Sequence, residues 1–334
     1  MDVVRLTRQL IDIPSVSGQE AEIARFVADT LTNLGAQVHL QEVEPGRPNV
    51  LAVFGDKPSV TLSTHLDTVP GDPVSSEDEA NVYGRGACDA KGILAAMVAA
   101  CERLARTGKS DFGLLAVVGE ERGSSGAYAA ATWEHDSRYL INGEPTENQL
   151  ALGSKGALRI ALDAEGTAAH SAYPELGHSA TDDLLDTLEA LRRAEWPSDP
   201  LLGDTTFNIG TLHAGTAPNV VPDHARAELL IRLVGDPEPV RDIVRSCLRG
   251  ATRLEEVLCI PAARFVALEG FEATTVRYTS DAPILCPAWG QPLLIGPGSI
   301  HVAHTDREFI AKADLVAATG LYASLVERLL ETLE

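Results

Sequence analysis

The 334-residue chain is poor in cysteine and in basic residues, and it contains no long apolar run. Its five cysteines are odd in number, widely spaced and free of any Cys-x-x-Cys pair, a pattern that argues against a disulfide framework or a thiolate zinc site. The longest apolar stretch, Ile93 to Cys101, is too short to span a bilayer. The first ten residues lack the basic start and apolar segment of a signal peptide. These absences predict a cytoplasmic protein with no membrane partner.

Positive charge is scarce, because 27 Lys and Arg residues face 48 Asp and Glu residues and leave a formal net charge of −21. Such an acidic chain is a poor partner for nucleic acid or for an anionic membrane surface. The acidity is most simply explained by solubility; attraction of a cationic small substrate is the less favoured alternative. Hydrophobic residues make up 45% of the chain, which is ordinary for a globular protein with a full core.

Two sequence patterns divide the chain. Up to about Gly153, short runs rich in Val, Leu and Ile alternate with helical stretches, which predicts a layered α/β domain with a mostly parallel sheet. Beyond that point, residues 157–166 and 224–235 alternate apolar and polar side chains, as antiparallel strands with one covered face do. The first pattern resumes at 292–298. We therefore predict a catalytic domain formed by residues 1–153 and 268–334, interrupted by a smaller inserted α+β domain at 154–267.

Individual elements follow from periodicity and punctuation. Ser17 and Glu20 predict a capping box that opens a helix, and Gly35 closes that helix. Strands are expected near 37–43, 49–54, 59–64, 113–119, 137–142 and 262–267, and further helices near 91–106, 180–194, 238–250 and 313–333.

Residue types that bind metals recur just past strand-like runs of the sequence. They are His65, Asp89, the pair Glu120 and Glu121, Glu144 and His304. In open α/β sheets, ligands bind beyond the carboxyl ends of the strands, so these residues are expected to converge on one edge of one sheet. Taken singly, each is better explained as a helix cap, a turn residue or a solvated side chain. Together they predict a metal site.

The local spacing suggests a role for several of these residues. Asp67 lies two positions after His65 on the same side of extended chain, where a carboxylate can accept the second N–H of a ligating imidazole. Asp89 starts the helix expected near 91–106, whose dipole favours the ionised carboxylate needed to bridge two cations. Glu120 and Glu121, as neighbours at a strand end, should point in opposite directions, so that one binds metal and the other acts as a base.

The number of ligands predicts a dinuclear centre. One bridging Asp, two His and two Glu provide three protein ligands for each of two metals, which suits catalytic Zn²⁺ with Co²⁺ or Mn²⁺ as substitutes. Such a pair of cations would activate a water molecule as a nucleophile at neutral pH. Competing motifs are weak, because the chain has neither a dinucleotide-binding spacing nor a GxSxG elbow.

Seven segments spread over nearly the whole chain resemble the acetylornithine deacetylase / succinyl-diaminopimelate desuccinylase family of dinuclear zinc amidohydrolases and exopeptidases. They are HLDTVPG, YGRGACDAKG, GEE, NGEPT, GTAAHSAYPELG, GTAPNVVPD and AHTDRE. The resemblance implies that His65 and Glu144 bind one zinc ion, that Glu121 and His304 bind the other, and that Asp89 bridges them. It also implies Glu120 as the general base and Asp67 as the partner of His65. His301 is a rival to His304, and His304 is preferred because the TDRE segment follows it.

The same resemblance implies roles for the inserted domain. It would act as a lid and form the contact of a homodimer, and His170 would reach the partner subunit's site to stabilise an oxyanion. Asn219 and Arg232 are similar to family residues that bind substrate; a solvent-facing strand position is a nearly equal alternative for Arg232. The substrate implied is a small N-acyl amino acid, with N-acetylornithine favoured.

Alternatives remain open at the level of substrate and class. A short acidic loop at 72–82 stands where many family members carry a longer one, and it resembles deacylases that release lysine or ornithine from a carrier protein. A succinyl-diaminopimelate desuccinylase, a metallo-exopeptidase and a binding protein that has lost catalysis are the other candidates.

Overall fold

The computed structural model describes residues 1–333, and they form two compact units. The first unit contains residues 1–152, 264–274 and the chain from residue 280 onward, and the second contains residues 153–263 and 275–279. Each unit has its own hydrophobic core. No helix in the described residues combines the length and apolar content needed to cross a membrane.

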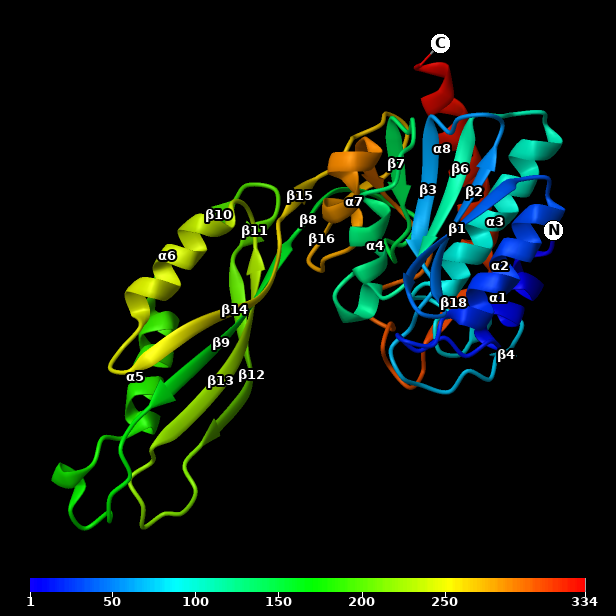
Figure 1. The fold of residues 1–334 in the computed structure, drawn as a ribbon. Coiled ribbons are helices and arrows are strands. Elements are labelled where there is room, and N and C mark those ends of the chain that lie inside the picture. The colour runs from blue at the N-terminus through cyan, green and yellow to red at the C-terminus, as the bar shows by residue number, and fades with distance from the viewer. Residues whose placement is uncertain (334) are drawn as a thin grey trace. The chain divides into compact units, whose positions relative to one another are not determined.

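The first unit is built on a mixed nine-stranded sheet (Figure 1). Its strands run in the order β1 (Gln37–Glu44), β2 (Arg47–Phe54), β6 (Phe112–Val117), β3 (Val60–His65), β7 (Tyr139–Asn142), β17 (Gln291–Leu294), β8 (Leu150–Ser154) and β15 (Ala263–Arg264), with β16 (Ala273–Val276) paired to β8. The four central strands β6, β3, β7 and β17 are parallel, whereas β1, β2 and β8 pair antiparallel. The predicted α/β class with a mostly parallel central sheet is confirmed.

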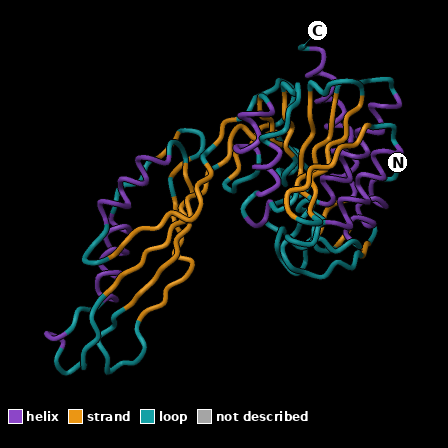
Figure 2. Tube along the Cα trace, viewed as in Figure 1, coloured by secondary structure: helices purple, strands orange, loops and turns teal. Residues whose placement is uncertain are grey.

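Helices cover both faces of this sheet, as Figure 2 shows. One face packs α1 (Val3–Ile11), α2 (Ala21–Asn33), α3 (Lys91–Arg106) and α8 (Lys312–Glu331), and the other packs α4 (Ser125–Ala130) and α7 (Ala282–Trp289). The alternation of side chains along a strand sets this arrangement. In β2, Val50 and Ala52 join the core under α3, whereas Leu51 and Val53 join the core under α7. The helix expected at 91–106 is therefore present, and 12 of its 16 residues are buried.

The strand that precedes Asp89 belongs to a separate three-stranded sheet and not to the main sheet. Strand β5 (Asn81–Tyr83) pairs antiparallel with β18 (Phe309–Ala311) and with β4 (Ser76–Glu77). The run before Asp89 was expected to belong to the parallel sheet. That prediction is wrong, because β5 has only three residues and pairs with β18. Asp89 consequently reaches the site from a loop between β5 and α3.

The capping box predicted at Ser17 and Glu20 is also wrong. Helix α2 has no side-chain hydrogen bond at its N-cap. The Ser17 hydroxyl instead donates to Asp67 at 2.6 Å, and the buried Glu20 carboxylate pairs with Arg47 at 2.7 Å. The half-buried guanidinium of Arg47 offers the Glu20 carboxylate a stronger, charged partner than a helix amide, so a tertiary contact replaces the predicted local motif.

The second unit is a four-stranded antiparallel sheet with two helices on one face. Its strand order is β12 (Thr206–Ala214), β13 (His224–Leu233), β9 (Gly156–Glu165) and β14 (Thr252–Ile260), and its helices are α5 (Ala180–Arg193) and α6 (Pro237–Cys247). A two-stranded ribbon of β10 (Ser198–Asp199) and β11 (Gly203–Asp204) completes it. The alternating segments are the central strands β9 and β13, as expected. Both edge strands escaped prediction because they are largely exposed and carry no clear apolar alternation.

Candidate metal centre

His65 ends β3 at the carboxyl edge of the parallel sheet, and it is buried. Its Nε2 lies 2.9 Å from Oδ1 of Asp89. Its Nδ1 lies 2.8 Å from the backbone oxygen of Asp67, whereas the Asp67 carboxylate is 3.6 Å away. The ring is thus oriented mainly by a backbone carbonyl, which accepts a hydrogen bond from the Nδ1–H and leaves Nε2 as the nitrogen that faces the site.

Asp89 stands between two imidazoles. While Oδ1 faces His65, Oδ2 lies 3.3 Å from Nε2 of His304. Burial raises the pKa of the Asp89 carboxyl, but the contacts with His304 and His65 outweigh burial and hold the pKa below its usual value. The ionised carboxylate with one oxygen on each side is the arrangement that a bridging ligand requires.

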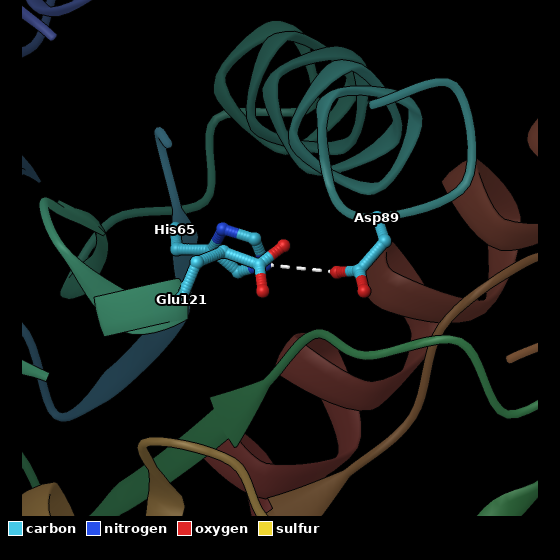
Figure 3. A group of neighbouring side chains, drawn as sticks. All are labelled: His65, Asp89 and Glu121. Carbon is cyan, nitrogen blue, oxygen red and sulfur yellow. Dashed lines mark hydrogen bonds and ion pairs between the residues drawn. The ribbon is translucent and has the colours of Figure 1, made fainter. Parts of the chain in front are cut away.

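Glu121 and His304 complete the cluster. Nε2 of His304 lies 2.9 Å from Oε1 of Glu121, and ligand atoms of His65, Asp89 and Glu121 all lie within 4.8 Å of one another. Figure 3 shows the ring of His65 and these two carboxylates directed toward one another. Among the described residues, no hydrogen bond or ion pair joins the rival His301 to this cluster.

The side chains of Glu120 and Glu121 diverge because both residues lie in a turn, and not because they alternate along a strand. Strand β6 ends at Val117, Gly119 adopts a left-handed conformation at φ 76°, and Glu120–Arg122 forms a short 3-10 helix η1. The expectation of an extended pair is therefore wrong. Side chains of a 3-10 turn still diverge, because each residue rotates by about a third of a turn.

Asp67 holds this turn in place. Its Oδ1 accepts the backbone N–H of Glu120 at 3.0 Å, and its Oδ2 accepts that of Glu121 at 3.2 Å and the hydroxyl of Ser17 at 2.6 Å. The Asp67 carboxylate, which was predicted to orient His65, thus mainly fixes the backbone that carries both glutamates.

Burial raises the pKa of three further carboxyl groups around the cluster. Burial raises the pKa of Glu120, and the nearby Glu144 adds to the effect; burial likewise raises the pKa of Glu144, with Asp89 as the next contributor. Oε1 of Glu144 is buried without a hydrogen-bond partner. Burial raises the pKa of Asp281 to about 6.

These observations fit a pair of divalent cations. The donors are imidazole and carboxylate, the mixture that suits zinc and related metals. The buried oxygen of Glu144 has no hydrogen-bond partner, and the carboxylates of Asp89 and Glu121 approach within 4.8 Å of each other, where a cation between them would relieve their repulsion. His65, Asp89 and Glu144 would hold one ion, and Asp89, Glu121 and His304 the other.

The remaining predicted residues belong to the second unit. His170 and Asn219 are exposed neighbours there: a β-bridge joins His170 to Val220, and the N–H of Ser171 donates to the oxygen of Asn219 at 3.0 Å. Arg232 lies apart from them on β13, where its Nη1 donates to the Thr279 hydroxyl at 3.2 Å.

Sequence reasoning missed two acidic residues of the first unit and one lysine of the second. Asp281, at the N-cap of α7, and Glu308, before β18, are buried and face the cluster or its supporting loop. Lys155 is buried beside Arg232 and Arg277. Glu308 closes the AHTDRE segment, so a signal existed for it; nothing local distinguishes Asp281 from an ordinary helix cap.

Comparison with known proteins gives consistent matches. Residues 61–328 match the model of peptidase family M20/M25/M40. A probable carboxypeptidase of Aspergillus niger is 38% identical over 368 residues, which cover 96% of this chain and 88% of the relative.

Solved structures share the fold. The aminopeptidase PepT of Bacillus cereus has a TM-score of 0.81 at 20% identity, with 98% of this chain and 97% of that one covered. The YXEP protein of Bacillus subtilis, described as a dinuclear metal-binding peptidase, has a TM-score of 0.74 at 15% identity, with 99% and 98% covered.

Proposed function

The chain is a member of peptidase family M20/M25/M40, and from this premise we propose that it is a metal-dependent exopeptidase that hydrolyses the amide bond next to a free carboxylate. The observation that carries the proposal is the convergence of His65, Asp89, Glu121 and His304, from four separate segments, onto one cluster. A structural role alone would not explain buried carboxylates brought so close together.

Glu120 is the residue that moves the proton. It is held by its backbone to Asp67, next to the ligand Glu121, and its carboxylate is not needed to complete either ligand set. Two divalent cations, when bound, would neutralise the carboxylates by their charge and, as Lewis acids, lower the pKa of a water molecule and polarise the scissile carbonyl. Glu120 accepts the proton of the attacking water and returns it to the departing amine nitrogen.

The second unit supplies a group of cations suited to a carboxylate. Lys155 is buried, and burial lowers its pKa, with the positive charges of Arg277 and Arg232 adding to the effect. Burial also lowers the pKa of Arg232. Lys155 is buried, Arg232 is half-buried and Arg277 is exposed, so the group is open to an anion that would offset the three positive charges. A guanidinium matches a carboxylate with two parallel hydrogen bonds. This favours a substrate that ends in a carboxylate, as carboxypeptidase substrates and N-acyl amino acids both do.

A homodimer formed through the second unit belongs to the same proposal. His170 would stabilise the oxyanion of the partner subunit's reaction, and Asn219 beside it would contact the substrate. Light scattering in solution measures the mass directly; a monomer that retains full activity would rule out this role of His170.

A substrate panel with and without chelator tests the function. We expect turnover of peptides or N-acyl amino acids that carry a free α-carboxylate in the presence of Zn²⁺, Co²⁺ or Mn²⁺, and a loss of at least about tenfold when that carboxylate is amidated. N-acetylornithine, N-succinyl-diaminopimelate and an acylated carrier protein belong in the same panel, since N-acetylornithine is the substrate predicted from sequence. Equal cleavage of amidated substrates would refute the exopeptidase assignment.

A further inference from the structure

Glu308 is a buried residue whose carboxylate contacts the backbone, and not the side chain, of Asp89. Its Oε1 accepts the backbone N–H of both Cys88 and Asp89, each at 3.0 Å. These amides are buried in a loop, outside any helix or sheet, so Glu308 is the partner that satisfies them. The chain separation of about 220 residues makes this a purely tertiary contact.

Arg85 fixes the other oxygen of the same carboxylate. Its Nη1 donates to Oε2 of Glu308 at 2.6 Å, and its Nε donates to the backbone oxygen of Pro70 at 3.2 Å. Both side chains are buried, so the pair is not weakened by solvent as a surface ion pair is. Glu308 therefore cannot rotate away from Asp89 without leaving a buried charge unpaired.

The backbone around Glu308 connects this contact to a second ligand. The carbonyl of Glu308 accepts the N–H of Gly84, and β18 continues the pairing with β5. His304 stands only four residues before Glu308, and it adopts a left-handed backbone at φ 63°. A non-glycine residue in that region is unfavourable and persists only when its surroundings fix it.

We propose that Glu308, held by Arg85, is a positioning residue for the dinuclear centre, because it fixes the bridging Asp89 through the backbone and the His304 loop through the chain. This inference rests on the proposed function, since it assigns a role toward the metals that function requires. Glu308 is not a ligand itself: both its oxygens are occupied by donors from Cys88, Asp89 and Arg85.

The substitution Glu308→Gln tests the role with little change of volume. A glutamine has one acceptor oxygen, so its NH₂ must oppose either the two amides or the guanidinium. We expect zinc affinity, measured by competition with a chromophoric chelator, to fall about 10- to 100-fold. The visible spectrum of the cobalt-loaded protein should also change, because the geometry of Asp89 and His304 is altered. Arg85→Lys keeps the charge but loses the fork, and it should show a smaller loss in the same direction.

Glu256→Gln is the matched control, because Glu256 pairs bidentately with Arg241 in the second unit and touches no ligand. It should leave metal affinity and the cobalt spectrum unchanged. Unaltered zinc affinity in folded Glu308→Gln or in Arg85→Lys would overturn the positioning role, even if either variant unfolds at a lower temperature. Failure of the unmodified protein to bind two metal ions would instead overturn the proposed function, so the two results are distinguishable.

Discussion

Asp281 offers a test of how a buried carboxyl group beside the cluster sets the pH dependence of stability. Its side chain is 1% exposed, and neither carboxylate oxygen has a hydrogen-bond partner of ordinary geometry. Burial raises its pKa to about 6, although the nearby Ser124 hydroxyl and His65 offset part of that effect. In an unfolded chain an aspartate titrates near pH 3.9.

The sign and size of the effect follow from this difference. Because the folded-state pKa is raised, the stability that Asp281 contributes is complete below about pH 4 and is lost as the pH rises through about 6. A difference of roughly two units corresponds to about 3 kcal/mol. Asp281→Asn removes the titration, so the metal-free variant should not lose this stability on going from about pH 4 to pH 8, whereas the unmodified metal-free protein should lose about 3 kcal/mol more.

Urea unfolding, followed by the fluorescence of the three tryptophans, measures this difference, and one of them, Trp289, lies on the same helix α7. Any penalty from the asparagine amide itself does not depend on pH, so the comparison across pH isolates the carboxyl group. Identical pH dependence in the variant and the unmodified protein would refute the argument that Asp281 is buried as an unpaired acid.

Three further predictions concern the centre. Glu120→Gln should retain both metal ions, measured by elemental analysis, while turnover falls at least about 10²-fold; ordinary turnover would remove Glu120 as the base. Chelation should lower the melting temperature, because the clustered carboxylates then repel one another; an unchanged transition with metal shown to be lost would contradict this. Asp67→Asn should lower kcat by about 10²-fold with a smaller change in metal content, because its amide opposes the N–H groups that hold Glu120 and Glu121; loss of metal without loss of kcat at saturating metal would contradict it.

Contacts between distant residues explain where reasoning from the sequence went wrong. Ser17 and Glu20 matched a capping box, yet Asp67 and Arg47 compete for them from elsewhere in the fold. The glutamate pair was expected in extended chain, but Gly119 turns the backbone before it. In each case the local pattern identified residues that matter, but contacts with Asp67 or Arg47 from elsewhere in the chain determine their geometry.

The identity of the substrate is the second property that the sequence alone did not determine. Five of the seven segments that carried the resemblance contain the candidate metal ligands or Glu120, which any enzyme of this chemistry needs. The relative described above is named a probable carboxypeptidase, and the match to the peptidase family does not single out N-acetylornithine as the substrate. The proposal of a carboxylate substrate rests on Lys155 and Arg277, and only the folded second unit reveals that these two residues are neighbours.

The sequence by itself determined the α/β class, the central strands and the identity of the clustered residues, because strand periodicity and the placement of polar residues after strands are local properties of the chain. Only the tertiary structure decided that Asp89 lies between His65 and His304, that Asp67 holds the glutamate turn, and that Glu308 holds Asp89 across about 220 residues. Those contacts are selected by burial, which forces each hidden donor and acceptor to find a partner wherever the fold places one.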